Sequence, residues 1–253
     1  MKIAIVTGAS SGLGREFVKA IEFNYSKLDE IWIIARRKER LEALSSEIKI
    51  KTRIFDYDLT DDSVLMGLYD ELELVNPDVK LLVNAAGYGA FGDFSESEYG
   101  TSVGMVDLNC KALTALCYMV IPHMSKRAKI VNMASAAAFC PQPKFAVYAA
   151  TKSYVLSFSR ALGFELKDRG ITVMAVCPGP VKTEFFDFAY NKKIPFLKRM
   201  SMANPAKVVK VVMKDLGLGK DISVYGLKMK AFRVIAKILP TNTVIKMAEK
   251  ANK

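Results

Sequence analysis

The sequence has few of the residues from which metal sites and disulfide frameworks are built. It contains one histidine, His123, and four cysteines, at positions 110, 117, 140 and 177, with no CxxC or other metal-ligand spacing. Scattered cysteines of this kind are typical of buried, reduced thiols in a cytosolic protein. We therefore expect no metal site and no disulfide, and we expect a cytoplasmic location.

Targeting segments and long apolar runs are also missing. Met1 to Thr7 is a short apolar run that meets a glycine at once, which favours a buried strand over a signal peptide. No uninterrupted apolar stretch reaches the ~18 residues expected of a membrane-spanning helix. The 253 residues contain no repeats, low-complexity segments or linkers, so we expect a single domain over residues 1–253.

The charge is unevenly distributed. Residues 1–185 carry 22 basic and 22 acidic side chains, whereas residues 186–253 carry 15 basic and 4 acidic ones, which accounts for the whole net charge of +11. We expect two basic, apolar helices over residues 226–252. They could pack on the core or on another subunit, lie on an anionic membrane, or contact an acidic partner such as acyl carrier protein. No nucleic-acid recognition motif is present, so we expect no nucleic-acid partner.

Apolar runs with the character of buried strands alternate with segments of helical periodicity. This alternation predicts an α/β fold with a single-domain, doubly wound parallel sheet of about seven strands (a Rossmann fold), helices on both faces, and a C-terminal helical extension. In such sheets, ligands bind beyond the carboxyl ends of the strands. The predicted strands are residues 2–7, 30–35, 51–56, 80–84, 129–133, 171–176 and 221–225.

A glycine turn follows the first predicted strand and leads directly into a helix. Its glycines would let the backbone approach a diphosphate, and the helix N-terminus would supply free N–H groups and the positive end of a dipole. Glycine turns also link many strands to helices that bind nothing, but the immediate helix and the two serine hydroxyls favour a nucleotide site. The turn runs through Thr7, Gly8, Ala9, Ser10, Ser11, Gly12, Leu13 and Gly14.

The residues after the second strand favour NADP over NAD. An acidic side chain there would accept hydrogen bonds from a free ribose 2′-hydroxyl, but the chain has Ala35 followed by Arg36. Guanidinium groups match the geometry of a phosphate, and Arg15 in the glycine motif could add another. Arg37 or Lys38, taken singly, fits a solvated basic turn.

Tyr148 and Lys152 lie one helical turn apart on a segment whose apolar spacing predicts a long helix. A phenol next to an ammonium group can act as a general acid and base, because a positive neighbour favours the phenolate. The pair alone does not distinguish a catalytic site from a structural helix, since this spacing is common on helices with a purely structural role.

The full set of motifs resembles the short-chain dehydrogenase/reductase family, in its NADP-preferring, bacterial-type branch. The resemblance covers residues 1 to about 185 and weakens after that. It is carried by Thr7-Gly8-x-x-x-Gly12-x-Gly14, Asn84-Ala85-Ala86-Gly87, Asn109, Ser135, Tyr148-x-x-x-Lys152 and Pro178-Gly179.

The resemblance implies a role for each matching residue. Tyr148 would exchange a proton with the substrate oxygen, Lys152 would lower the pKa of Tyr148 and hold the nicotinamide ribose, Ser135 would orient the substrate, and Asn109 would hold a water. The cofactor-binding residues implied beyond the glycine turn and Arg36 are Asp58, Leu59, Asn84, Ala85, Ala86, Gly87, Pro178, Gly179, Val181 and Thr183.

We therefore interpret the chain as an NADPH-dependent oxidoreductase acting on a carbonyl or alcohol, and as a homo-oligomer (dimer or tetramer) like the proteins it resembles. Residues 184–202, rich in aromatic side chains, would form a lid over an apolar substrate, although a plain packed helix has the same composition. One alternative is a 3-oxoacyl reductase acting on chains linked to acyl carrier protein or CoA. An alternative of another class is a non-catalytic NADP(H)-binding regulator.

Overall fold

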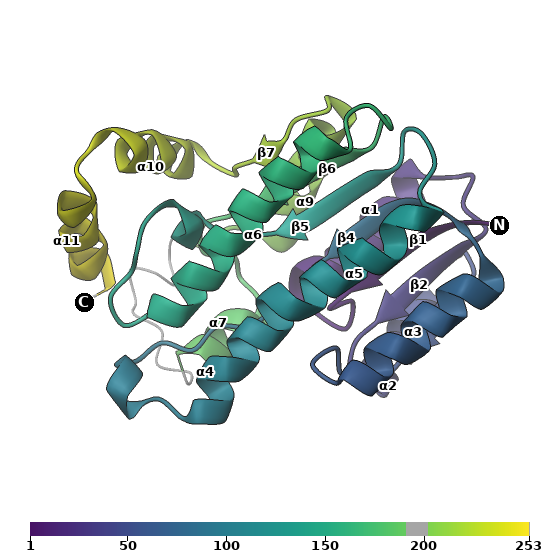
Figure 1. The fold of residues 1–253 in the computed structure, drawn as a ribbon, viewed down its shortest axis with the longest axis horizontal. Helices are drawn as coiled ribbons and strands as arrows, with labels where there is room; N and C mark the ends of the chain where they lie inside the picture. The colour runs from purple at the N-terminus through teal and green to yellow at the C-terminus, as the bar shows by residue number, and fades with distance from the viewer. Residues whose placement is uncertain (191–201, 253) are drawn as a thin grey trace.

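The computed structural model describes residues 1–190 and 202–252. It contains a seven-stranded sheet in the order β3-β2-β1-β4-β5-β6-β7, with every neighbouring pair parallel (Figure 1). The order reverses between β1 and β4, so the predicted doubly wound Rossmann fold is confirmed. The strands are β1 (Lys2–Thr7), β2 (Glu30–Ile34), β3 (Thr52–Phe55), β4 (Asp78–Asn84), β5 (Lys129–Met133), β6 (Thr172–Val176) and β7 (Ile222–Ser223).

Helices cover both faces of the sheet because alternate residues of each strand point to opposite sides. In β1, Ile3 and Ile5 belong to one buried cluster, and Ala4 and Val6 belong to another. The first cluster packs under α3 (Asp62–Val75), α5 (Leu113–Val120) and α6 (Ala146–Glu165). The second packs under α1 (Gly12–Asn24), α2 (Lys38–Glu47) and α9 (Pro205–Gly217).

Helix α4 (Tyr99–Val106) continues through a π-helical segment, η2 (Asp107–Ala112), into α5. By length and composition alone, the run Tyr99–His123 could cross a membrane. However, Leu113, Leu116 and Val120 are buried against the sheet, as in the core helix of an α/β protein. π-Helical segments are rare and are found frequently at functional sites.

The two expected C-terminal helices are present as α10 (Leu227–Ile238) and α11 (Thr241–Asn252), at one end of the molecule (Figure 1). They pack near the short 3₁₀ segment η4 (Ala136–Phe139), which directly follows β5. Val244 and Ala248 of α11 form a small buried cluster with Cys140, and Phe232 and Ala236 of α10 pack against it. The C-terminal helices therefore lie beside the carboxyl ends of the strands.

All four cysteines are free thiols, three of them buried and Cys110 half-buried. Burial raises the pKa of Cys117 and of Cys177 to about 12, and it also raises the pKa of Cys110 and Cys140. Among residues 1–190 and 202–252, no three His, Cys, Asp or Glu side chains are grouped so as to hold a metal ion.

Candidate active site

A cavity of about 750 Å³ opens at the carboxyl ends of the strands. It gathers the glycine turn after β1 and the segments that follow β2, β3, β4, β5 and β6. Most of the cofactor-binding and catalytic residues that we expect from the sequence line this cavity. They are Gly8, Ser10, Ser11, Gly12, Leu13, Gly14, Arg36, Asp58, Leu59, Ala85, Ala86, Gly87, Ser135, Tyr148, Lys152, Pro178, Gly179, Val181 and Thr183.

The glycine turn folds tightly against the start of α1. Gly8 has a φ of +65°, and a Cβ atom on Gly14 would lie 2.2 Å from the carbonyl oxygen of Gly8. Both positions therefore require glycine, the first for its backbone conformation and the second for its close contact. Ser11, the N-cap of α1, makes no side-chain capping bond. Free N–H groups at such a helix N-terminus favour an anion.

Thr7 and Asn84 were expected to contact a cofactor, but the structure places both behind the cavity wall. The Thr7 hydroxyl oxygen accepts hydrogen bonds from the N–H groups of Ala85 and Ala86, at 3.1 and 3.0 Å. The buried Asn84 amide donates to the Asn132 side-chain oxygen at 2.9 Å and so ties β4 to β5. Both residues therefore fix the shape of the 84–87 loop rather than the cavity surface.

The arginines are distributed differently from the sequence-based expectation. Arg15 does not line the cavity, because its guanidinium pairs with Glu47 of α2. Arg36 lines the cavity and lies 3.6 Å from the Asp58 carboxylate. Arg37, interpreted from sequence as a solvated basic turn, also lines it and donates to the Ser10 and Ser11 hydroxyls at 3.1 and 2.9 Å. The structure thus brings Arg36 and Arg37 together, and not Arg15.

Arg37 also connects the cavity to α7 (Glu184–Ala189). Its guanidinium donates to the Glu184 carboxylate at 2.8 Å, and Arg40 pairs with the same carboxylate. These two arginines lower the pKa of Glu184. Sequence reasoning did not identify this contact, because Glu184 lies 147 positions from Arg37.

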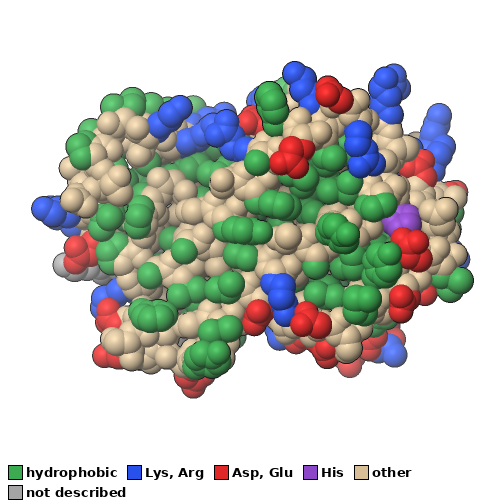
Figure 2. All heavy atoms as spheres, viewed as in Figure 1, with side chains coloured by type: hydrophobic (Ala, Val, Ile, Leu, Met, Phe, Trp, Pro, Cys, Tyr) green, Lys and Arg blue, Asp and Glu red, His purple; other side chains and the backbone are tan. Residues whose placement is uncertain are grey.

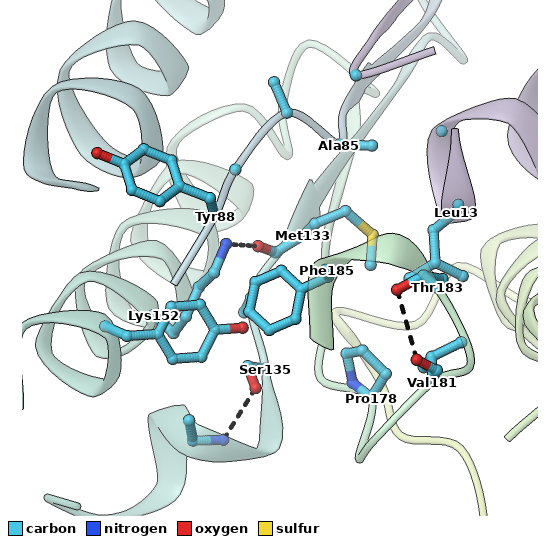
Figure 3. Close-up of a pocket in the computed structure, with 18 of the residues that line it drawn as sticks. Leu13, Ala85, Tyr88, Met133, Ser135, Lys152, Pro178, Val181, Thr183 and Phe185 are labelled. Carbon is cyan, nitrogen blue, oxygen red and sulfur yellow. Dashed lines mark hydrogen bonds between the residues drawn. The ribbon is translucent and has the colours of Figure 1, made fainter. Parts of the chain in front are cut away.

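Ser135, Tyr148 and Lys152 lie together in the cavity wall. Ser135 follows β5, its hydroxyl accepts from the Ala137 N–H at 3.1 Å, and it is close enough to the Tyr148 phenol to act on the pKa of that group. The Lys152 ammonium donates to the carbonyl oxygen of Met133 at 2.7 Å (Figure 3). It lies 5.6 Å from the centre of the Tyr148 ring. Lys152 is 4% exposed, so its charge is almost fully removed from water.

Burial sets the protonation of this group. It raises the pKa of Tyr148 to about 12, although the neighbouring Ser135 hydroxyl acts to lower it, and it lowers the pKa of Lys152 to about 8. The expected lowering of the tyrosine pKa by Lys152 is therefore not seen, and burial raises the pKa instead. At neutral pH Tyr148 carries its proton and can donate it.

Asn109 lies in the π-helical segment η2 and is 1% exposed. Its amide nitrogen donates to the Tyr88 carbonyl at 2.9 Å and to the Thr151 hydroxyl at 3.1 Å, and its oxygen accepts from the Tyr88 N–H at 3.1 Å. It does not line the cavity. A Cβ atom on Gly87 would lie 2.7 Å from the Asn109 oxygen and 3.3 Å from the Lys152 nitrogen, so Asn109 and Lys152 flank the same glycine.

Aromatic rings form the wall of the cavity near Tyr148. Phe145 stacks on Tyr148 with ring centres 4.4 Å apart, and the ring of Phe185 of α7 lies 5.3 Å from that of Tyr148. A Cβ atom on Gly89 would lie 2.7 Å from the Tyr148 ring, so only glycine fits there. Of the expected lid, residues 184–190 and 202 are described and Phe185 and Phe186 line the cavity, whereas residues 191–201 lie outside the described residues.

The C-terminal helices supply cavity residues that sequence reasoning missed. Met229 packs against Gly179, where a Cβ atom would lie 2.8 Å from the Met229 sulfur, and Phe232 contacts Phe139 with ring centres 6.3 Å apart. The resemblance fades in this region, so only the apolar spacing of the segment could have indicated it. The cavity residues from α10 and α11 are Lys228, Met229, Phe232, Met247 and Ala248.

The sequence profile described as "short chain dehydrogenase" matches residues 2–193, which is about three quarters of the chain. The chain belongs to the short-chain dehydrogenase/reductase family. It is therefore an oxidoreductase that acts on CH–OH or C=O groups and has a nucleotide-binding Rossmann fold.

Curated relatives are about 30% identical to this short-chain dehydrogenase/reductase over the aligned residues. The very-long-chain 3-oxoacyl-CoA reductase of Anas platyrhynchos is 30% identical over 267 residues, covering 99% of this chain and 80% of that protein. The sulfoacetaldehyde reductase 2 of Chromohalobacter salexigens is 32% identical, covering 72% and 74%. The match to the 17-beta-hydroxysteroid dehydrogenase type 3 of Mus musculus, at 29% identity, spans 75% of this chain and 63% of that protein.

Solved structures agree with this assignment. A short-chain dehydrogenase from Sphingobium yanoikuyae in complex with NADPH superimposes with a TM-score of 0.77 at 26% identity, covering 95% of this chain and 96% of that one. The closed form of a serine dehydrogenase complexed with NADP+ superimposes with a TM-score of 0.76 at 25% identity, covering 88% and 93%.

Proposed function

We propose that the protein is an NADPH-dependent reductase of a carbonyl group on an apolar substrate, with Tyr148 as the general acid. One observation carries the proposal. The Tyr148 phenol and the Ser135 hydroxyl lie next to each other and next to the Lys152 ammonium, in the same cavity as the glycine turn.

The residues around the cavity suit a dinucleotide. The glycine turn, which lines the cavity, and the uncapped start of α1 suit the diphosphate, and Arg36 and Arg37 suit a 2′-phosphate. Asp58 and Leu59 would contact the adenine, Ala85 to Gly87 and Lys152 the nicotinamide ribose, and residues 178–183 the carboxamide. When bound, the reduced nicotinamide supplies a hydride to the substrate carbon.

The chain's own contribution is proton transfer and charge stabilisation. Negative charge builds on the carbonyl oxygen as hydride arrives, and two donors, the Tyr148 phenol and the Ser135 hydroxyl, are available to stabilise it. The raised pKa of about 12 keeps Tyr148 protonated at neutral pH, as reduction requires. The rings of Phe145 and Phe185 shield the site from water, which strengthens these interactions.

Two other functions remain in competition. Relatives named as very-long-chain 3-oxoacyl-CoA reductases favour a 3-oxoacyl thioester as the substrate, and the apolar walls of the cavity suit an acyl chain. A non-catalytic NADP(H)-binding regulator would need the glycine turn and the arginines, but it would not need a buried phenol, hydroxyl and ammonium placed around one point.

An activity assay separates these functions. The purified protein is mixed with NADPH and a panel of carbonyl compounds that includes ketones, aldehydes and 3-oxoacyl-CoA esters of increasing chain length, and the absorbance of NADPH is followed. We expect turnover with apolar ketones, and a rise in kcat/KM with acyl length if thioesters are the substrates. Tight NADPH binding without oxidation of NADPH by any compound would instead support the regulator.

The cofactor preference depends on Arg36 and Arg37. We expect Arg36→Ala and Arg37→Ala each to raise the KM for NADPH by roughly 10- to 100-fold, because a charge-assisted hydrogen bond is worth about 1.5–3 kcal/mol. The KM for NADH should change little. Arg15→Ala is the matched control, since its guanidinium pairs with Glu47 outside the cavity. Equal effects on both cofactors, or a loss with Arg15→Ala alone, would contradict the assignment.

A further inference from the structure

Helix α10 is apolar on two opposite sides. Side chains advance 100° per residue around a helix, so Leu227, Val234 and Ile238, at intervals of seven and four, fall within about 40° of one another. We call this row the outer stripe. Its members are 84%, 55% and 73% exposed, respectively. The opposite side carries Met229 and Phe232, which line the cavity, so one face of α10 already packs on the protein and the outer stripe does not.

Basic residues border the outer stripe. By the same geometry, Lys230 and Lys237 lie along one edge of it, about 60–80° from Leu227. Both are exposed, as are Lys228 and Arg233. Figure 2 shows Lys and Arg side chains beside hydrophobic ones over this end of the molecule, at the upper left. Long lysine stems can lie along an apolar surface while their ammonium groups reach a polar layer.

The charge of this region decides between possible occupants. Residues 226–253 contain seven Lys or Arg and one acidic residue, Glu249, a net charge of +6. Two copies of the chain meeting through the outer stripe would bring +6 against +6, which opposes association. An acidic carrier protein would complement the charge of the lysines, but its acidic surface would not bury the aliphatic side chains of the outer stripe. An anionic lipid surface accommodates both, since an interfacial helix places aliphatic side chains among the lipids and cations at the headgroups.

We propose that the outer face of α10 docks on an anionic membrane surface. Met247 of α11 is 43% exposed and also lines the cavity. It therefore continues the exposed apolar surface of α10 toward the cavity. Docking therefore places one wall of the cavity at the lipid boundary. If the proposed function holds, docking has a further consequence for the substrate. An apolar carbonyl substrate dissolved in the lipid reaches Tyr148 past α10 and α11 without crossing water.

Vesicle sedimentation tests the docking without any cofactor or turnover. The full chain is incubated with vesicles of phosphatidylcholine alone or of phosphatidylcholine mixed with phosphatidylglycerol, and bound protein is measured in the pellet. We expect binding only to the mixed vesicles, weakened by high salt. Leu227→Ser/Ile238→Ser should weaken binding at least about tenfold, because each side chain loses its transfer into lipid. Lys230→Glu/Lys237→Glu should also weaken it, by loss of attraction to the headgroups.

The matched control is Phe23→Ser/Leu74→Ser, which removes two apolar side chains that are 88% and 82% exposed on α1 and α3. It should bind vesicles like the wild type. Circular dichroism of all variants confirms that they fold. The proposal is overturned if the wild type does not sediment with anionic vesicles, or if the serine variant at 227 and 238 sediments as well as the wild type does. The second outcome would indicate a purely electrostatic contact, as with an acidic carrier protein. Vesicle binding without NADPH oxidation would refute the proposed function and not the docking.

Discussion

Tyr148→Phe is expected to reduce kcat by about 10²–10⁴-fold, the range that a positioned general acid contributes. The substitution removes one oxygen atom and leaves the ring stacked on Phe145 and beside Phe185. The cavity therefore keeps its shape, and the affinity for NADPH should stay close to that of the wild type. Stopped-flow measurement of NADPH oxidation, together with a fluorescence titration of NADPH, gives both quantities.

Tyr154→Phe on the same helix is the control. Tyr154 is 42% exposed, and its hydroxyl is 2.7 Å from that of Thr114, away from the cavity. This variant should react at the wild-type rate. Normal turnover by Tyr148→Phe would remove the proposed mechanism, whereas a loss of NADPH affinity in that variant would mean that the phenol holds the cofactor rather than the substrate oxygen.

Lys152→Met is expected to make the protein more stable and much less active. Keeping an ammonium group protonated at neutral pH when burial lowers its pKa from 10.5 to about 8 costs roughly 3 kcal/mol. Methionine has a similar shape and carries no charge, but the hydrogen bond to the Met133 carbonyl is lost. We expect a net stabilisation on the order of 1 kcal/mol, or about 2–4 °C in Tm. Activity should fall by at least about 10²-fold, since the cation next to Tyr148 is gone.

The pH dependence of this stabilisation identifies its cause. A cation whose pKa is lower in the folded state is protonated more fully in the unfolded chain between the two values. The wild type therefore gains stability as pH rises from about 8 toward 10.5. The advantage of Lys152→Met should be constant below pH 8 and shrink above it. Thermal melts of both proteins across this range measure the difference, with Lys210→Met at an exposed position of α9 as the control. A difference independent of pH would assign the effect to packing.

The parts of the fold that short sequence patterns encode could be predicted. The seven strands follow from apolar runs that end at turns, and the glycine turn follows from its position between a strand and a helix. Ser135, Tyr148 and Lys152 meet because two of them share one helical turn and the third ends the neighbouring strand. Such short-range rules place residues at the correct edge of the sheet, and the family motifs then select among them.

Long-range contacts explain what could not be predicted. The sequence does not show which of Arg15, Arg36 and Arg37 reach the cavity. Long-range contacts decide this: Arg15 forms an ion pair with Glu47, whereas Arg37 donates hydrogen bonds to Ser10 and Ser11. The π-helical segment around Asn109 has no local signature, because its hydrogen bonds to Tyr88 and Thr151 depend on the packing of α6. The contribution of α10 and α11 to the cavity depends on where they dock.

The burial of Cys117 and Cys177 has a practical consequence. A thiol reacts with alkylating agents and oxidants as its thiolate, and a pKa of about 12 leaves almost none of that form at neutral pH. In the native protein these two thiols should therefore resist air and maleimide reagents without added reductant. Their modification becomes fast only when the protein unfolds, so the rate of maleimide incorporation at Cys117 and Cys177 measures the rate of unfolding.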